Sequence, residues 1–248
     1  MNGDKMVYEN LNSLLGVMGN FPDARYGAMP GVTLCDSGVD DAYENYALLE
    51  DWDSAKQSIE HGLEFFRRNG HPHIWPLFPW IPDEACRILE GFGLVRDEDF
   101  QAMTAETQDS ASDCANRGVT GPIRGDGDAR EWAACAWSGF DSDGDPPEPF
   151  ISNARNMARH GAFSLMHADG RATGMLFAAE KTCGIYYVAT HPKHRGHGLA
   201  GTIAENLKSR ALRLGFKYAA LLATPSGRRL YLKHGFSDGG TVKIYKAE

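Results

Sequence analysis

The chain has 248 residues, 42% hydrophobic and 23% charged, a balance typical of a globular protein with a substantial buried core. Its formal net charge of −8 argues against general nucleic-acid binding, which needs a basic face. The apolar stretches are short and interrupted by charge, and the first residues lack the pattern of a signal peptide. We therefore expect a cytoplasmic protein without a membrane segment. The five cysteines contain no CxxC pair, which favours buried thiols over a disulfide framework or a zinc site.

In the N-terminal half, apolar residues recur at helical spacing over Asp53–Asn69, and the segments His73–Phe78, Pro82–Gly91 and Asp97–Ala105 follow. This order repeats part of the plan of the C-terminal half. The letters LEGFGL at Leu89–Leu94 also align with YLKHGF at Tyr231–Phe236. The similarity is weak, so it indicates either two copies of one fold or coincidence.

Three acidic runs stand out, at Asp36–Asp53, Asp97–Asp99 and Asp141–Glu148. They are either solvated surface or, for one of them, the lining of a groove for a cationic, amine-bearing substrate. The aromatic segment His71–Trp80 either packs against the second half of the chain or forms a wall of an acceptor pocket.

The C-terminal half has a clear order of elements. Two helices are followed by a hairpin whose turn is Ala168–Arg171, then by strand, helix, strand, short helix and strand. Thr224 and Pro225 are typical of an N-cap followed by proline at the first helical position. The order predicts a mixed α/β domain with at least one parallel pair of strands. The ranges are Glu131–Phe140, Phe150–His160, Phe163–His167, Thr173–Ala179, Gly184–Thr190, Leu199–Leu214, Tyr218–Ala223, Ser226–His234 and Phe236–Lys246.

Between strand 184–190 and helix 199–214 lies a basic, glycine-rich turn, a suitable site for phosphate because helix N-termini carry unpaired N–H groups. Its letters GHGLAG, Gly196–Gly201, match the G-x-G-x-x-G pattern of a dinucleotide-binding fold. The context excludes that fold. HPKHR separates the strand from the first glycine, the next strand carries no ribose-binding acid, and too few residues follow Gly201.

The same segment also fits R-x-x-G-x-A from Arg195 to Ala200, and GRRLYLKHGF follows at Gly227–Phe236. Here the chain resembles the GNAT superfamily of acyl-CoA-dependent N-acetyltransferases over roughly 119–246. The resemblance implies an acyl-CoA N-acyltransferase (GNAT-like) fold, an α/β fold with an α+β mixed sheet. We expect it in tandem, with a degenerate N-terminal copy at residues 1–110 and an acetyl-CoA-binding domain at residues 111–248. The acidic turn of the first copy would repel phosphate.

The resemblance implies that acetyl-CoA is the acyl donor. Its diphosphate would lie on the backbone of the loop, and its pantetheine arm would pair with the preceding strand, where one N–H would hold the developing oxyanion. The expected binding residues are Val188, Ala189, Thr190, Arg195, Gly196, His197, Gly198, Leu199, Ala200 and Gly201.

Tyr231 is the expected general acid, since a phenol can donate a proton to the leaving thiolate. The general base stays open between Glu180, His191 and water. The spacing His191, His194, His197 is unsuited to a metal in a glycine loop, so no metal is expected.

These patterns predict an N-acetyltransferase that transfers an acetyl group to a primary amine by direct attack. The alternative is a catalytically inactive acyl-CoA-binding sensor or interaction module. The expected partners are a small-molecule or peptide amine, with a homodimer possible and no nucleic acid or membrane.

Overall fold

The computed structural model describes residues 2–107, 118–119, 122–123 and 125–247. Every strand found in these residues belongs to a single mixed sheet with the order β1-β2-β3-β4-β10-β5-β9-β8-β7-β6. The N-terminal half contributes α1 (Gly3–Met18), β1 (Arg25–Met29), β2 (Val32–Asp36), η1 (Ala42–Glu44), β3 (Tyr46–Leu49), α2 (Trp52–Ala55), α3 (Ile59–Asn69), β4 (His73–Leu77), α4 (Asp83–Gly91) and β5 (Val95–Glu106). The C-terminal half contributes α5 (Asp126–Gly139), α6 (Glu148–Arg159), β6 (Phe163–His167), β7 (Ala172–Ala178), β8 (Cys183–Thr190), η2 (Pro192–His194), α7 (Leu199–Arg213), β9 (Tyr218–Ala223), α8 (Pro225–Lys233) and β10 (Ser237–Ala247).

The mixed α/β sheet expected from the sequence is confirmed, and the two halves share one plan. An antiparallel hairpin, β1-β2 or β6-β7, is followed by an antiparallel neighbour, β3 or β8. That strand then pairs in parallel with β4 or β9. A short helix, α4 or α8, leads in each half into the long last strand, β5 or β10. The aligned segments 89–94 and 231–236 fall at this same helix-to-strand corner.

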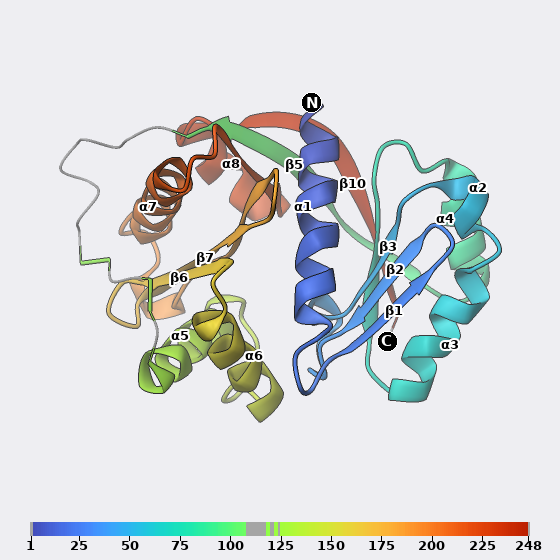
Figure 1. Ribbon diagram of the computed structural model, residues 1–248, viewed down its shortest axis with the longest axis horizontal. Helices are drawn as coiled ribbons and strands as arrows, with labels where there is room; N and C mark the ends of the chain where they lie inside the picture. Colours follow the sequence, from blue (N-terminus) through green and yellow to red (C-terminus); the bar gives the residue numbers. More distant parts are fainter. Residues whose placement is uncertain (1, 108–117, 120–121, 124, 248) are drawn as a thin grey trace.

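The last strands of the two halves are exchanged. β10 lies between β4 and β5, and β5 lies between β10 and β9, all antiparallel. Figure 1 shows β5 and β10 together between the two halves. Each half therefore completes its sheet with a strand from the other. The expected division into residues 1–110 and 111–248 stays a prediction, because residues 108–117 lie outside the described part of the chain.

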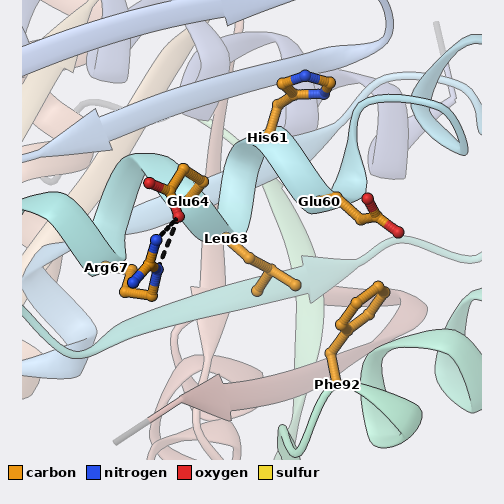
Figure 2. A pocket seen from close by; sticks show the side chains of 6 residues that line it. All are labelled: Glu60, His61, Leu63, Glu64, Arg67 and Phe92. Atoms are coloured by element: carbon orange, nitrogen blue, oxygen red, sulfur yellow. Dashed lines mark hydrogen bonds and ion pairs between the residues drawn. The ribbon is translucent and has the colours of Figure 1, made fainter.

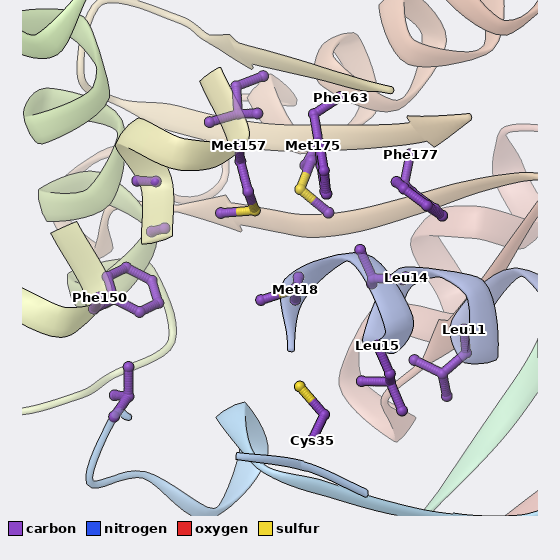
Figure 3. Packing of buried hydrophobic residues seen from close by; sticks show 14 of the residues in the cluster. Leu11, Leu14, Leu15, Met18, Cys35, Phe150, Met157, Phe163, Met175 and Phe177 are labelled. Atoms are coloured by element: carbon purple, nitrogen blue, oxygen red, sulfur yellow. The ribbon is translucent and has the colours of Figure 1, made fainter. Parts of the chain in front are cut away.

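β4, β6 and β7 are buried almost along their whole length, as strands of a sheet covered on both faces must be, and their successive side chains point to opposite faces. One face packs against α1, α5 and α6, and Figure 3 shows Leu14 and Met18 of α1 beside Met175 and Phe177 of β7. The opposite face is covered by α7 and α8 in the C-terminal half and by α2, α3 and α4 in the N-terminal half. α1 thus packs against strands of both halves.

Local signals explain several element ends. The Oγ1 of Thr224 accepts a hydrogen bond from the Gly227 N–H at 3.1 Å, which confirms the predicted N-cap of α8. Asp169 and Gly170 have φ of 48° and 65°, as a tight two-residue hairpin turn requires, which confirms the turn between β6 and β7. The single helix expected over Asp53–Asn69 is divided into α2 and α3, with Asp51 capping α2.

Candidate functional site

A β-bulge interrupts β8 close to its end. Thr173 pairs with Ala189 and Met175 with Tyr186, so Tyr187 and Val188 lie opposite the single residue Gly174. Tyr187 has a φ of +51°, a conformation that residues other than glycine seldom adopt. Its carbonyl accepts a hydrogen bond from the Thr173 Oγ1 at 3.1 Å. The bulge bends β8 just before the residues expected to pair with pantetheine.

β8 also departs from its parallel neighbour. Within the described residues its register with β9 consists of one pair, Gly184 with Ala220. Beyond this pair, residues 185–190 of β8 have no register partner on β9. Val188, Ala189 and Thr190 therefore lie on a stretch of strand with one edge left open for main-chain hydrogen bonds to a ligand.

The glycine loop follows β8 and leads directly into α7. Gly196 and Gly198 have φ of +80° and +76°, and an added Cβ would meet nothing within 4 Å at either position. The glycines are thus required by backbone conformation and not by crowding. Gly198 is the N-cap of α7 and supplies no side-chain hydrogen bond. The first N–H groups of the helix, at Leu199 and Ala200, remain available to an anion.

Arg195 binds the end of α5. Its guanidinium donates hydrogen bonds to the Gly139 carbonyl and the Asp141 carboxylate, both at 2.9 Å. It also contacts the Thr190 carbonyl at 3.3 Å. The ring of His197 interacts through Nδ1 with the Arg195 carbonyl at 2.9 Å. These contacts join the loop to the last turn of α5.

Gly201 has a packing role. It is buried in α7, and a Cβ at this position would overlap the imidazole of His234 beyond the end of α8. His234 is in turn paired with Glu205 at 2.9 Å. The absence of a side chain at Gly201 lets α7 approach α8, and its participation in cofactor binding stays a prediction.

Tyr231, the expected acid, lies on α8 and is 9% exposed. Its ring makes an edge contact with Phe236 at 5.5 Å between centroids and packs in the same apolar cluster as Ile203 and Ala204 of α7. Burial raises the pKa of the phenol above its ordinary value of 10. Tyr231 therefore remains protonated over the physiological range, as a proton donor must.

The two expected bases, Glu180 and His191, lie at opposite ends of β8. Glu180 is exposed in the turn between β7 and β8, at the end of β8 opposite to the glycine loop. His191 begins the loop itself, where its Nδ1 accepts a hydrogen bond from the Lys193 N–H at 3.3 Å and caps η2. The structure brings His191 and not Glu180 next to the loop, and the base role of each stays a prediction.

A carboxylate that the sequence did not single out contacts the bulge. The hydroxyl of Tyr187 donates a hydrogen bond to Oε2 of Glu44 at 2.6 Å. Burial raises the pKa of Glu44 from 4.5 to about 8, the Tyr187 hydrogen bond opposes this rise, and Asp41 adds to it. Glu44 lies in the acidic run Asp36–Asp53, which the sequence offers as a possible lining for a cationic substrate. No spacing within the run distinguishes Glu44 from the other carboxylates.

Three aromatic rings from the C-terminal half of the chain lie next to the ring of Tyr187. Trp132, Phe150 and Phe140 lie 5.3, 6.1 and 6.2 Å from it between ring centroids. Phe140 is 50% exposed, while Trp132 is buried. The bulge thus has a carboxylate on one side and an apolar wall with an exposed edge on the other.

The N-terminal half has no comparable anion site at the equivalent place. The turn after β3 ends in Asp51, whose carboxylate accepts a hydrogen bond from the Ser54 N–H at 2.8 Å. The helix N-terminus there already holds a negative charge. An incoming phosphate would be repelled, as the acidic sequence of this turn predicts.

A pocket of about 430 Å³ is found elsewhere, between α3 and the corner after α4. Figure 2 shows the ion pair of Glu64 and Arg67 on one side of it and Leu63 and Phe92 on another. It shares no residue with the bulge or the loop. Among the described residues, no group of three or more His, Cys, Asp or Glu could hold a metal ion, and no helix is long and apolar enough to cross a membrane.

Comparisons with known proteins agree with the fold described above. The model of the acetyltransferase (GNAT) family matches residues 127–236. A GCN5-related N-acetyltransferase from Kribbella flavida is similar in structure, with a TM-score of 0.65 and 18% identity, covering 96% of this chain and 94% of that one. No curated protein matches the chain in sequence.

Two further solved structures share the fold. A GCN5-related N-acetyltransferase from Sphaerobacter thermophilus has a TM-score of 0.61 and 14% identity, covering 88% of this chain and 76% of its own. A tandem GNAT protein from the clavulanic acid biosynthesis pathway has a TM-score of 0.57 and 11% identity, covering 100% and 97%. The likeness to a tandem protein extends over both halves of the chain.

Proposed function

We propose, from the match of residues 127–236 to the model of the GNAT acetyltransferase family, that the protein is an N-acyltransferase that moves an acetyl group from acetyl-CoA to a primary amine. The observation that carries the proposal is the continuous arrangement of a bulged strand, an open strand edge and a glycine loop at the N-terminus of α7. In this arrangement a thioester and a diphosphate can be bound by main-chain groups of one segment, Tyr187–Ala200.

Each part of the segment has a distinct role in the proposal. The N–H groups from Gly196 to Ala200 hold the diphosphate, because the left-handed glycines turn successive amides toward one anion. The edge of β8 at Val188–Thr190 pairs with the pantetheine arm. One of its N–H groups polarises the thioester carbonyl and stabilises the oxyanion that forms on attack.

Tyr231 acts in the proposed reaction as the general acid. The amine nitrogen attacks the carbonyl carbon, the C–N bond forms and the C–S bond breaks, and Tyr231 gives its proton to the departing sulfur. The buried phenol suits this step because its pKa is held above 10, so that the proton is present when the thiolate leaves.

Titration of the protein with acetyl-CoA by calorimetry tests the binding half of the proposal, and thiol release in the presence of a panel of primary amines tests the chemical half. We expect saturable binding and amine-dependent release of the thiol. No saturation at millimolar acetyl-CoA would overturn the proposal. Binding without turnover of any amine would instead identify an acyl-CoA-binding sensor.

A further inference from the structure

We infer that Glu44, a side chain of the N-terminal half, binds the ammonium group of the acceptor and takes its proton before attack. The inference rests on the proposed N-acyltransferase function. Both halves then contribute to the active site. The C-terminal half binds the donor, and a carboxylate of the N-terminal half binds the acceptor amine.

Glu44 is placed at the reacting end of the donor site by its contact with the bulge. It ends η1, between β2 and β3, and its Oε2 accepts the 2.6 Å hydrogen bond from the Tyr187 hydroxyl. Tyr187 directly precedes Val188 and lies on the stretch of β8 that has no register partner on β9. Its side chain therefore connects this stretch, where the donor is expected, to Glu44.

The bulge residue is held in an unusual conformation by contacts at both ends. The backbone of Tyr187, at φ +51°, is fixed by the hydrogen bond from Thr173 to its carbonyl, and its hydroxyl is fixed by Glu44. A strained backbone conformation of this kind persists only where neighbouring contacts hold it in place, and such residues cluster at functional sites. The Glu44 contact therefore orients the side chain that borders the acyl position.

The surroundings of Glu44 lack a counter-charge. In the described part of the chain it forms no ion pair with Lys, Arg or His. The groups in electrostatic contact with it are Asp41, before η1, Tyr46 of β3, Cys35 of β2 and Tyr187 of β8. All of these are neutral or negative. A partly buried carboxylate among such neighbours attracts a cation, and an alkylammonium group supplies one.

The rings next to Tyr187 indicate what carries the ammonium group. Phe140 is 50% exposed and presents apolar surface beside the Tyr187 ring, while Phe150 lies buried behind it at 2% exposure. An ammonium group on a short apolar or aromatic body can contact Glu44 while the body packs against Phe140. The inferred substrate class is therefore a primary arylalkyl or alkyl amine, in preference to a polyhydroxylated amine.

The proton balance of the step closes with these groups. The ammonium nitrogen gives its first proton to the Glu44 carboxylate, and the free amine attacks the thioester carbon. The C–N bond forms, the C–S bond breaks, and Tyr231 gives its proton to the departing sulfur, which leaves as the thiol. The nitrogen loses its second proton as the amide forms, and this proton restores the Tyr231 phenol by way of solvent. The first proton passes from Glu44 to solvent, so that one ammonium ion and one thioester give one amide, one thiol and one released proton.

Glu44→Gln tests the inference, with 2-phenylethylamine as the acceptor and 2-phenylethanol as its neutral analogue. The substitution should lower kcat/KM for the amine by about 100-fold or more, the usual range for loss of a general base. It should also remove the rise of kcat/KM through about pH 8. Affinity for acetyl-CoA should stay within twofold of wild type. Glu9→Gln, at an exposed site on α1, is the matched control and should change none of these values.

Unchanged kcat/KM and an unchanged pH profile in Glu44→Gln would overturn the inference while leaving the proposed function intact. If wild type transfers no acetyl group, calorimetric binding of 2-phenylethylamine at pH 9 still decides, because Glu44 is ionised above its pKa of about 8. Binding by wild type but not by Glu44→Gln supports the ammonium site, whereas equal binding, or no binding by wild type, overturns it. Binding of 2-phenylethanol as tight as that of the amine also overturns it. If Glu44→Gln fails to fold, Glu44→Asp and Tyr187→Phe are measured in its place, and wild-type kinetics in both would count against the inference.

Discussion

The guanidinium of Arg195 lies 2.9 Å from the carboxylate of Asp141, although the two residues are 54 positions apart in the chain. Through this contact, and through the Gly139 carbonyl, the glycine loop is bound to the C-terminal end of α5. A loop fixed in this way keeps its amides in place before a ligand arrives, and the guanidinium adds positive charge beside them.

Arg195→Ala should therefore weaken acetyl-CoA binding by about 10-fold, a value at the lower end for a charge-assisted hydrogen bond because the side chain is exposed. Calorimetric titration measures the change. Arg213→Ala removes the same charge at the far end of α7 and should leave the affinity unchanged. Equal losses in the two variants would mean that net charge, and not the loop contact, controls binding.

Gly198→Asp should abolish detectable acetyl-CoA binding, because it places a carboxylate at the N-terminus of α7 where the diphosphate is expected. Gly215→Asp is a close control. Gly215 has a φ of +89°, near the +76° of Gly198, and an added Cβ meets nothing within 4 Å at either. Both variants should lose similar stability in thermal melts, but only Gly198→Asp should lose affinity. Retained binding by Gly198→Asp would exclude the loop as the diphosphate site.

Gly201→Ala should destabilise the fold by about 1–3 kcal/mol, the usual cost of overpacking, because its Cβ would overlap the imidazole of His234. Urea denaturation measures this loss. His234→Ala in the same background should recover much of it, since the smaller residue removes the overlap. Additive losses in the double variant would show that the two positions are not coupled.

Tyr231→Phe should lower kcat by about 100-fold or more while leaving the affinity for acetyl-CoA near that of wild type. The ring remains to pack against Phe236, so the fold should be unaffected. Rates and affinities measured on the same preparations separate the two effects. An unchanged kcat would remove Tyr231 from the acid role.

Glu44→Gln should become more stable relative to wild type as the pH rises from 5 to 9. The folded-state pKa of Glu44 is raised from 4.5 to about 8, so the folded state binds more protons than the unfolded state in this window. Stability contributed by the neutral carboxyl is then lost as the pH rises toward 8. The difference should reach on the order of 2 kcal/mol, or about 4–8 °C in melting temperature. A difference that does not vary with pH would contradict the raised pKa.

The C-terminal half was predictable because its signals are local. The N-cap at Thr224, the turn at Asp169–Gly170 and the glycines before α7 each fix a backbone conformation through neighbours in sequence. These signals placed β9 at its observed bounds, Tyr218–Ala223. The loop and Tyr231 both lie within residues 127–236, which match the model of the acetyltransferase (GNAT) family.

What the sequence did not predict depends on contacts between distant residues. The bulge at Tyr187 has no turn-forming residue to mark it, since its positive φ follows from the register of β7 and β8. Glu44 is one of several carboxylates in its run, and only the fold sets it against a tyrosine 143 residues away. The pairing of β10 with β4 and β5 is likewise a property of the whole sheet.

The exchange of β5 and β10 makes the two halves mutually dependent. In the N-terminal half alone, β4 would lack its neighbour β10, and in the C-terminal half alone, β9 would lack its neighbour β5. Each bare edge would offer unpaired main-chain groups to another chain. The N-terminal half is thus needed as a folding partner, even though Asp51 caps the helix N-terminus after β3 and leaves no place there for an anion. Loss of this half would remove β5 and expose the edges of β9 and β10.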